Sequence, residues 1–140
     1  MKKNFEFLEH STDIKFIAYG KDLESCFENA AKAMFSSILD LNSINDSEKR
    51  TIKVKAENLD ELLHDWLTEL LFIFETENLA FKRFDVSIRK NRGYKISADV
   101  GGEILDNKYR INTEIKAVTY HDMVIEKTRD GWSAQVLCDI

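Results

Sequence analysis

Two short acidic segments at opposite ends of the sequence could together bind a metal ion. The first is the run 10–13, which ends in Asp13, and the second is the run 138–140, in which Asp139 stands beside the terminal carboxylate of Ile140. Anionic groups held side by side raise each other's pKa unless a cation lies between them. If the first strand pairs near the last, Asp13 joins them, and three such oxygen donors suit Ca²⁺, Mg²⁺ or Mn²⁺ better than Zn²⁺. In the alternative interpretation, Asp13 is an ordinary turn residue and Asp139 is a solvated chain end, because Asp is common in such places.

A third polar segment, 113–121, carries Glu114, Lys116 and His121 along an expected strand. Taken alone, His121 is more typical of a turn than of a metal site. The sequence has no Gly-rich phosphate loop, no zinc-binding His-Glu-x-x-His helix, no Cys-x-x-Cys pair and no Gly-x-Ser-x-Gly elbow. We interpret Cys26 and Cys138 as small buried hydrophobic residues, which is how free cysteines usually behave. The usual signatures of an enzyme are therefore absent.

Two amphipathic helices are predicted to position these segments. Asp22 is a plausible N-cap for the first, which has apolar residues at intervals of three and four from 23 to 39. Asn58 and Glu61 resemble a capping box before the second helix, and its apolar stripe over 59–74 predicts packing against both the sheet and the first helix. An alternating pattern predicts strands elsewhere. They are expected within 5–9, 14–19, 52–56, 84–88, 94–100, 109–115, 123–127 and 132–138.

An order with helices early and strands late is typical of the α+β class. We expect two helices packed on a mixed or antiparallel sheet, in a single domain over residues 1–140. The turn signals at 91–93 and 130–131 predict β-hairpins. The first of these makes segment 81–105 a candidate hairpin subdomain that protrudes from the main sheet.

Composition excludes several classes of protein. The 140 residues include 20 basic and 25 acidic side chains, a net charge of −5, so no direct binding of nucleic acid is expected. The basic clusters at 82–83 and 89–92 are interpreted as solvated strand ends. The longest apolar run, 70–74, is far too short to span a bilayer, so no membrane partner is expected. No secretory signal is evident, and two cysteines fit a reducing, cytoplasmic location.

Five ordered blocks of the chain resemble the archease family. The family pattern His-Thr-Ala-Asp-Ile appears as His10-Ser11-Thr12-Asp13-Ile14, and the block Glu-Ile-Lys-Ala-Val-Thr-Tyr-His is intact at 114–121. The replacement of Thr-Ala by Ser11-Thr12 leaves Asp13 in place and affects only the contacts of its neighbours. The five blocks together span the full length, at 10–14, 19–31, 59–71, 114–121 and 131–140.

The resemblance implies a protein cofactor rather than an enzyme. Such a protein acts on the RtcB-type tRNA-splicing ligase, promotes guanylylation of the ligase's active-site histidine, permits multiple turnovers and can broaden the nucleotide that the ligase accepts. The resemblance also implies a divalent cation, described as calcium, with Mg²⁺ or Mn²⁺ as alternatives. Its ligands would be the side chains of Asp13 and Asp139 and an oxygen of Ile140. Lys116 is implicated in activation, and His10 and His121, which lie in the same segments, are further candidates for that role.

Two other functions compete with ligase activation. The first is a chaperone-like interaction module that stabilises several nucleic-acid-modifying proteins. The second is a metal-dependent hydrolase that uses Asp13, Asp139 and His121. We disfavour the hydrolase because the chain lacks an assembled set of nucleophile, base and orienting group. The acidic net charge favours an activator that docks on a basic RNA-binding enzyme, since complementary charge steers such encounters.

Overall fold

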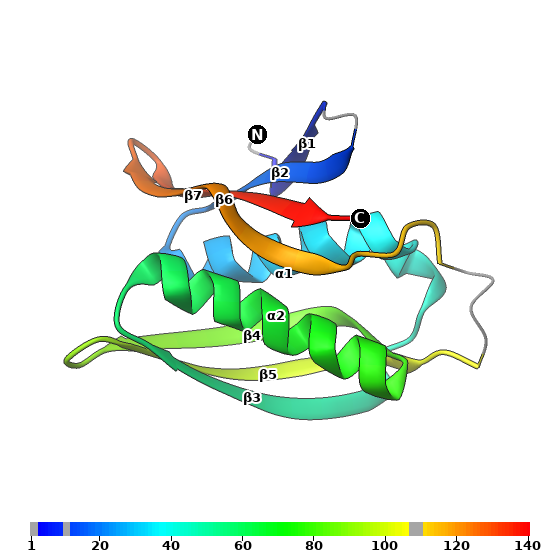
Figure 1. Ribbon diagram of the computed structural model, residues 1–140. Helices are drawn as coiled ribbons and strands as arrows, with labels where there is room; N and C mark the ends of the chain where they lie inside the picture. Colours follow the sequence, from blue (N-terminus) through cyan, green and yellow to red (C-terminus); the bar gives the residue numbers. More distant parts are fainter. Residues whose placement is uncertain (1–2, 10–11, 107–110) are drawn as a thin grey trace.

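Two β-sheets lie on either side of a layer formed by two helices (Figure 1). The structure is a computed structural model, and it describes residues 3–9, 12–106 and 111–140. Its elements are β1 Phe5–Leu8, β2 Asp13–Gly20, α1 Leu23–Ile38, the 3₁₀ helix η1 Leu41–Ser43, β3 Glu48–Ala56, α2 Leu59–Glu77, β4 Leu79–Lys90, β5 Tyr94–Ile104, β6 Ala117–Thr128 and β7 Gly131–Asp139. The four-stranded sheet has the order β1-β2-β7-β6 and the three-stranded sheet has the order β3-β5-β4. All pairings among these strands are antiparallel.

Both helices begin where the sequence predicts. The Asp22 carboxylate accepts a hydrogen bond from the backbone N–H of Ser25 at 2.8 Å, and the Ser25 hydroxyl completes a capping box. The Asn58 side chain accepts from the backbone N–H of Glu61 at 2.9 Å. The box predicted there is only half formed, because the Glu61 carboxylate accepts from the amide of Glu57, at 3.0 Å, instead of that of Asn58. Within the described residues, no helix is long and apolar enough to cross a membrane.

The hydrophobic core joins the helix layer to the three-stranded sheet. Phe35 on α1 is fully buried, and its ring meets those of Phe74 and Phe81 edge to face, with centroids 6.1 and 5.9 Å apart. It also stacks on Phe84, at 6.1 Å. The buried indole N–H of Trp66 on α2 donates to a backbone carbonyl of α1 at 3.1 Å. Aromatic contacts of this kind stabilise beyond the area that they bury.

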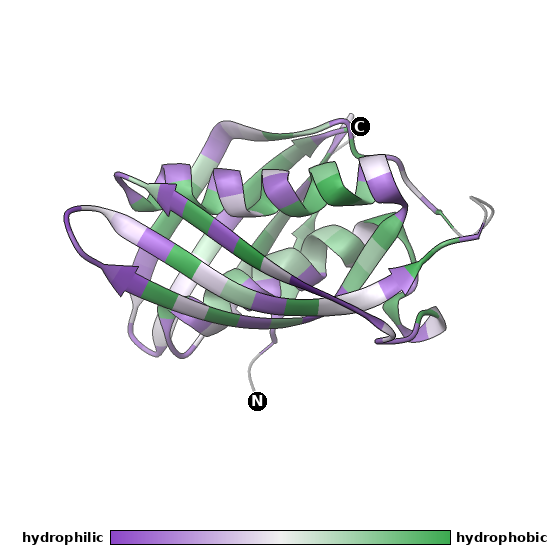
Figure 2. Cartoon of the chain, turned by 90° about the horizontal axis from the view of Figure 1, so that it is seen from below, coloured by the Kyte–Doolittle hydropathy of each residue, from purple (hydrophilic) through white to green (hydrophobic). Residues whose placement is uncertain are grey.

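The α+β class is confirmed, with two differences in the sheets. The strands form two antiparallel sheets, because the apolar faces of the helices point in two directions and each needs a cover. Segment 81–105 forms the β4–β5 hairpin, but it is not a protruding subdomain. Its inward-facing residues Phe84, Val86 and Ile96 are buried in the common core, and β3 pairs with β5 along its length. Figure 2 views this sheet from below and shows apolar and polar residues alternating along its strands.

The strand predicted over 109–115 is wrong for residues 111–115, and the residues before 111 lie outside the described part. The amides of Asn112 and Thr113 donate to the carbonyl of Ile38, at 2.6 and 3.4 Å, at the end of α1. Ile115 is buried and packs with the core. The alternating apolar residues therefore hold a loop against the helix end, where unpaired carbonyls need donors.

Candidate metal site

Asp13 and Asp139 meet at one end of the two central strands of the four-stranded sheet. Asp13 at the start of β2 is the direct Cα partner of Asp139 at the end of β7. Side chains opposite each other in an antiparallel pair point to the same face, with Cβ atoms about 5 Å apart. That face is the outer one, because the alternating neighbours Phe16, Val136 and Cys138 are buried against the helices. The expected meeting of Asp13 and Asp139 is therefore confirmed, although the strand that pairs with the last one, β7, is the second strand, β2.

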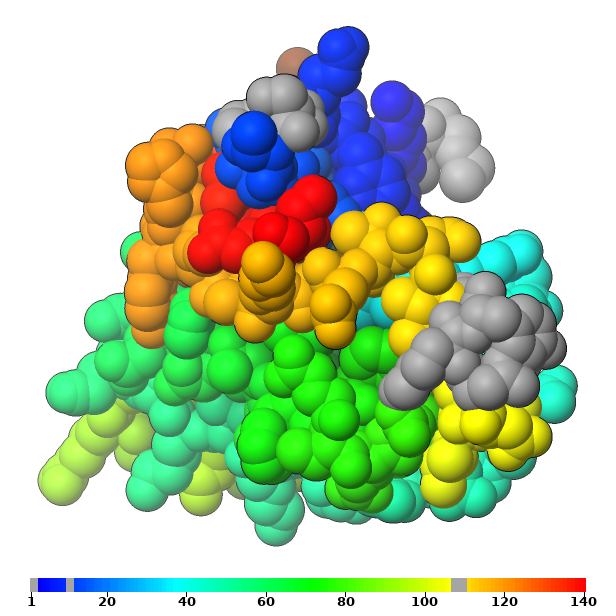
Figure 3. Space-filling view, turned by 45° about the vertical axis from the view of Figure 1, so that its right-hand side comes forward, coloured from blue at the N-terminus to red at the C-terminus, as the bar shows by residue number. Residues whose placement is uncertain are grey.

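Further groups approach Asp139 from the opposite side. Its Cα partner on β6 is Ala117, and the backbone N–H of Lys116 donates to the Asp139 carbonyl at 2.8 Å. Ile140 follows directly and is exposed, as is Lys116. In Figure 3 the red residues of the C-terminal segment lie between blue residues of the N-terminal region and the yellow-orange segment near 111–117. The structure thus brings together Asp13, Lys116, Asp139 and Ile140, whereas His10 lies outside the described residues.

The chemistry of these donors fits a hard divalent cation. Asp13 is half-buried, with its Oδ1 atom buried, and Asp139 is exposed. Among residues 3–9, 12–106 and 111–140, no group of three or more His, Cys, Asp or Glu side chains could hold a metal ion. Two carboxylates would therefore need oxygens from the backbone, from Ile140 or from water, and Ca²⁺ takes such ligands readily. Zinc prefers thiolate and imidazole ligands.

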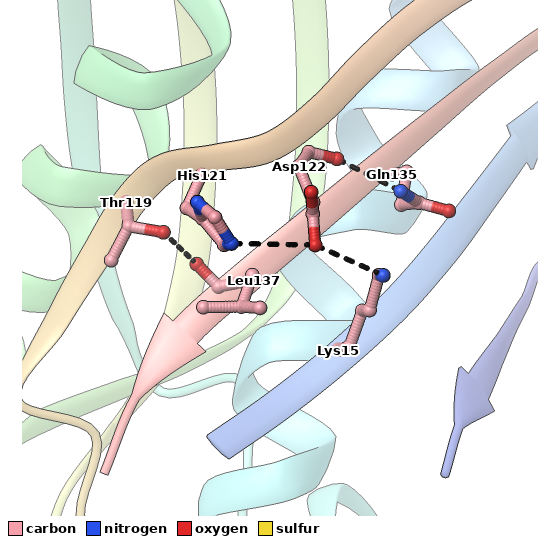
Figure 4. Close-up of polar contacts among 6 residues, drawn as sticks. All are labelled: Lys15, Thr119, His121, Asp122, Gln135 and Leu137. Atoms are coloured by element: carbon pink, nitrogen blue, oxygen red, sulfur yellow. Dashed lines mark hydrogen bonds and ion pairs between the residues drawn. The ribbon is translucent and has the colours of Figure 1, made fainter. Parts of the chain in front are cut away.

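A polar contact that the sequence did not reveal covers the same face. The pairing of β6 with β7 shifts between Thr119 and Val124, and within this irregularity Asp122 has a φ of 56°. The Asp122 carboxylate lies 3.3 Å from the Lys15 ammonium, and its backbone carbonyl accepts from the Gln135 amide at 2.8 Å (Figure 4). Lys15 stands two residues after Asp13 on the same face. The Lys15 ammonium therefore forms its ion pair with Asp122.

His121 belongs to this polar contact and not to the carboxylate pair. Its Nε2 atom lies 3.6 Å from the Asp122 carboxylate, and its side chain is highly exposed. Among the described residues, no three His, Cys, Asp or Glu side chains lie close enough together to hold a metal ion. His121 therefore does not form a three-residue metal site with Asp13 and Asp139. The metal-dependent hydrolase therefore lacks the third side chain that it was assigned.

His64 connects α2 to the strand that follows Lys116. Its Nε2 lies 3.1 Å from the carbonyl of Val118, and its Nδ1 lies 2.9 Å from the Asp65 carboxylate. Its ring also stacks on Tyr120, with centroids 4.2 Å apart. The sequence shows His64 only on the polar side of a helix. Its role was missed because two of its partners come from a strand more than fifty residues away.

Both cysteines behave as buried hydrophobic residues, as predicted. Burial raises the pKa of the Cys26 thiol to about 12. Burial, followed by the charge of Asp139, raises the pKa of the Cys138 thiol to about 12 as well. A thiol needs its thiolate form to act as a nucleophile. Neither cysteine therefore supplies a reactive group beside the candidate metal site.

Comparison with known proteins gives a consistent result. Residues 5–140 match the archease protein family. A protein archease from Methanosarcina barkeri is 50% identical over 141 residues, which cover 99% of this chain and 97% of the relative. The solution structure of a Methanobacterium thermoautotrophicum protein has a TM-score of 0.86 at 40% identity, covering 98% of this chain and 99% of that one. The crystal structure of a Thermotoga maritima archease, described as a possible chaperone, has a TM-score of 0.62 at 21% identity and covers 100% of this chain and 98% of its own. The last likeness extends to the fold alone.

Proposed function

The chain belongs to the archease family, and we propose that it activates an RtcB-type tRNA-splicing ligase. In this proposal it is a cytoplasmic protein cofactor, not an enzyme, and it promotes guanylylation of the ligase, multiple turnover and acceptance of further nucleotides. The observation that best supports the proposal is the direct pairing of Asp13 with Asp139. These are the two positions to which the family resemblance assigns a divalent cation.

We propose that Asp13 and Asp139, with an oxygen of Ile140, bind Ca²⁺, or Mg²⁺ or Mn²⁺ in its place. Two carboxylates on the same face of neighbouring strands repel each other. A divalent cation between them removes this repulsion, because its charge balances that of the two carboxylates. The β2–β7 ladder fixes the two Cα positions, so the backbone that carries both carboxylates is in place before the cation binds.

Lys116 would act next to the carboxylate pair. Its backbone N–H is fixed on the Asp139 carbonyl at 2.8 Å, while its side chain is exposed. The ammonium can therefore extend into a docked ligase without disturbing this protein's fold. There it would offset negative charge on a nucleotide triphosphate as the guanylyl group is transferred. The net charge of −5 would favour docking on a basic ligase surface.

A chaperone-like role is the second candidate, because the Thermotoga maritima archease is described as a possible chaperone. The two functions differ in one measurable respect. A chaperone of this kind suppresses aggregation of the ligase without accelerating nucleotide transfer to ligase that is already folded.

We test the proposal with a time course of guanylylation, using folded cognate ligase and labelled GTP with and without this protein. We expect at least about a tenfold faster transfer, the effect of about 1.4 kcal/mol on the barrier. Ligation of several RNA molecules per ligase should accompany it. Suppressed aggregation with an unchanged guanylylation rate would contradict ligase activation and favour the chaperone.

A further inference from the structure

The outer face of the three-stranded sheet gathers basic side chains from three strands. Lys53 and Lys55 lie on β3, Lys95 on β5 and Arg89 on β4, and all four are exposed. We call these four residues the basic patch. Lys55, Lys95 and Arg89 are direct partners in the pairing of β3, β5 and β4. With strands about 4.8 Å apart, the three cations form a row about 10 Å long.

This row does not contribute to the stability of the fold. Like charges directly opposite each other in a sheet are destabilising. Among the described residues, no member of the basic patch forms an ion pair. Other basic residues of the same sheet are paired, as Arg50 is with Glu77 at 2.8 Å and Arg83 with Asp46 at 2.6 Å. The charges of the basic patch are therefore not neutralised by acidic side chains of the described residues and are available to bind an anionic ligand.

The basic patch lines a hollow of about 730 Å³. The hydroxyls of Ser87 and Ser97, which pair with each other across β4 and β5, lie in the next row of the same face. Two acidic residues, Glu57 and Glu61, also line the hollow at its edge. The Glu61 carboxylate already accepts the amide of Glu57 at the start of α2. Cations backed by hydroxyl donors are the groups that contact the phosphates and sugars of nucleic acids.

The hairpin turn adds a further cation at the end of the hollow. Arg92 lines it and has a φ of 54°, a conformation that glycine or asparagine adopts at lower cost. Gly93 beside it has a φ of 123°, and a Cβ there would meet the Ala56 carbonyl at 2.9 Å. The turn thus requires glycine at position 93, whereas position 92 has an arginine in a left-handed conformation that is strained for this residue type. Strained residues tend to occur at functional sites.

We infer that the basic patch binds the phosphate backbone of an RNA strand. The choice of RNA among polyanions rests on the proposed function, since a tRNA-splicing ligase handles RNA. No large exposed hydrophobic side chain of the described residues lines the hollow, so insertion into a lipid surface is not indicated. The patch lies across the helix layer from the sheet that carries Asp13 and Asp139 (Figure 1). RNA could thus be bound on the three-stranded sheet while the end of the other sheet that carries Asp13 and Asp139 contacts the ligase.

This inference differs from the expectation, based on net charge, of no direct contact with nucleic acid. The net charge of −5 concealed the basic patch, because Lys53 and Lys55 are distant in sequence from Arg89 and Lys95 and only the pairing of β3, β5 and β4 brings them together. Asp85 and Asp99, direct partners two rows away, limit the patch to one end of the face. The sequence interpretation of Arg89 as part of a solvated strand end did not include its cross-strand neighbours.

The test is fluorescence anisotropy of a short labelled single-stranded RNA with the full chain. We expect a dissociation constant of about 10⁻⁵ M at low salt, in the range of sequence-independent binding. Four phosphate contacts predict that log K falls with log salt with a slope of about −3. The double variant Lys55→Glu with Arg89→Glu should bind at least about tenfold more weakly, and its slope should fall to about half. Its thermal stability should be unchanged or higher, because it relieves repulsion within the row.

A matched double variant separates the basic patch from overall charge. Lys21→Glu with Lys127→Glu changes the net charge equally at two exposed positions outside the hollow, and it should bind RNA like the original chain. Equal loss in both double variants, or no binding by the original chain, would overturn the inference. Binding of a poly-glutamate peptide in place of RNA would overturn it as well.

Failure of this inference is distinguishable from failure of the proposed function. Guanylylation of the ligase is measured with GTP and without RNA. The double variant Lys55→Glu with Arg89→Glu should therefore stimulate guanylylation fully although its affinity for RNA is reduced. If the original chain binds RNA but does not stimulate guanylylation, the proposed function fails and RNA binding stands.

Discussion

Replacement of Asp139 by asparagine returns the rate of ligase guanylylation to that of the ligase alone. Asparagine keeps the shape of the side chain but removes one of the two charges that face each other across β2 and β7. Affinity for a divalent cation should fall at least about tenfold, because hard cations depend on charged oxygen ligands. Asp139 is exposed and its backbone pairing is unaffected. The free energy of unfolding without metal should therefore change by less than about 0.5 kcal/mol.

The measurement pairs a guanylylation time course with urea unfolding in chelator. Asp99→Asn is the matched control, since Asp99 is an exposed strand carboxylate on the other sheet. It should stimulate the ligase fully. If Asp139→Asn also stimulates fully, the carboxylate pair is not the part of the molecule that acts on the ligase. If Asp139→Asn fails to stimulate the ligase only because the variant is unfolded, the urea unfolding curve will show a large loss in the free energy of unfolding.

Phe35→Ala should lower the free energy of unfolding by about 4 kcal/mol, the cost typical of emptying a buried aromatic site. Phe35 has no exposed surface and contacts Phe74, Phe81 and Phe84, so its loss leaves a cavity between both helices and β4. The core around it is rigid aromatic packing that cannot collapse fully into the space. Urea unfolding followed by circular dichroism measures the change.

Phe72→Ala is the control for this prediction. Phe72 lies on the same helix as Phe74, but 56% of it is exposed. Its truncation should cost less than about 1 kcal/mol. Equal losses in the two variants, or a loss below about 2 kcal/mol for Phe35→Ala, would show that the helix layer does not depend on this aromatic cluster.

The sequence predicted those parts of the fold that local interactions determine. The N-caps Asp22 and Asn58 bond to amides three residues away, so their signals lie within a single turn of chain. The hairpin turns at 91–93 and 130–131 are equally local. The division of the strands into two sheets depends on which helix face each strand covers. This assignment of strands to helix faces depends on tertiary packing, and the hydrophobic periodicity of a single segment does not reveal it.

The candidate site divides in the same way. The meeting of Asp13 and Asp139 could be predicted, because pairing of the strand that begins at Asp13 with the last strand places both residues at one end of the sheet. The pairing of Asp122 with Lys15 could not, because it depends on an irregularity in β6 that leaves no signal in the residue pattern. The loop 111–116 was mistaken for a strand because its alternating apolar residues pack on the end of α1 and not on a neighbouring strand.

The most direct measurement is a calorimetric titration of Ca²⁺ into the chain and into Asp13→Asn, each first freed of metal. We predict one binding event per chain for the original protein and none in the same concentration range for Asp13→Asn, with Asp99→Asn binding like the original. Unchanged binding by Asp13→Asn, or no binding by the original chain, would contradict the proposal that these two strands hold a cation between them.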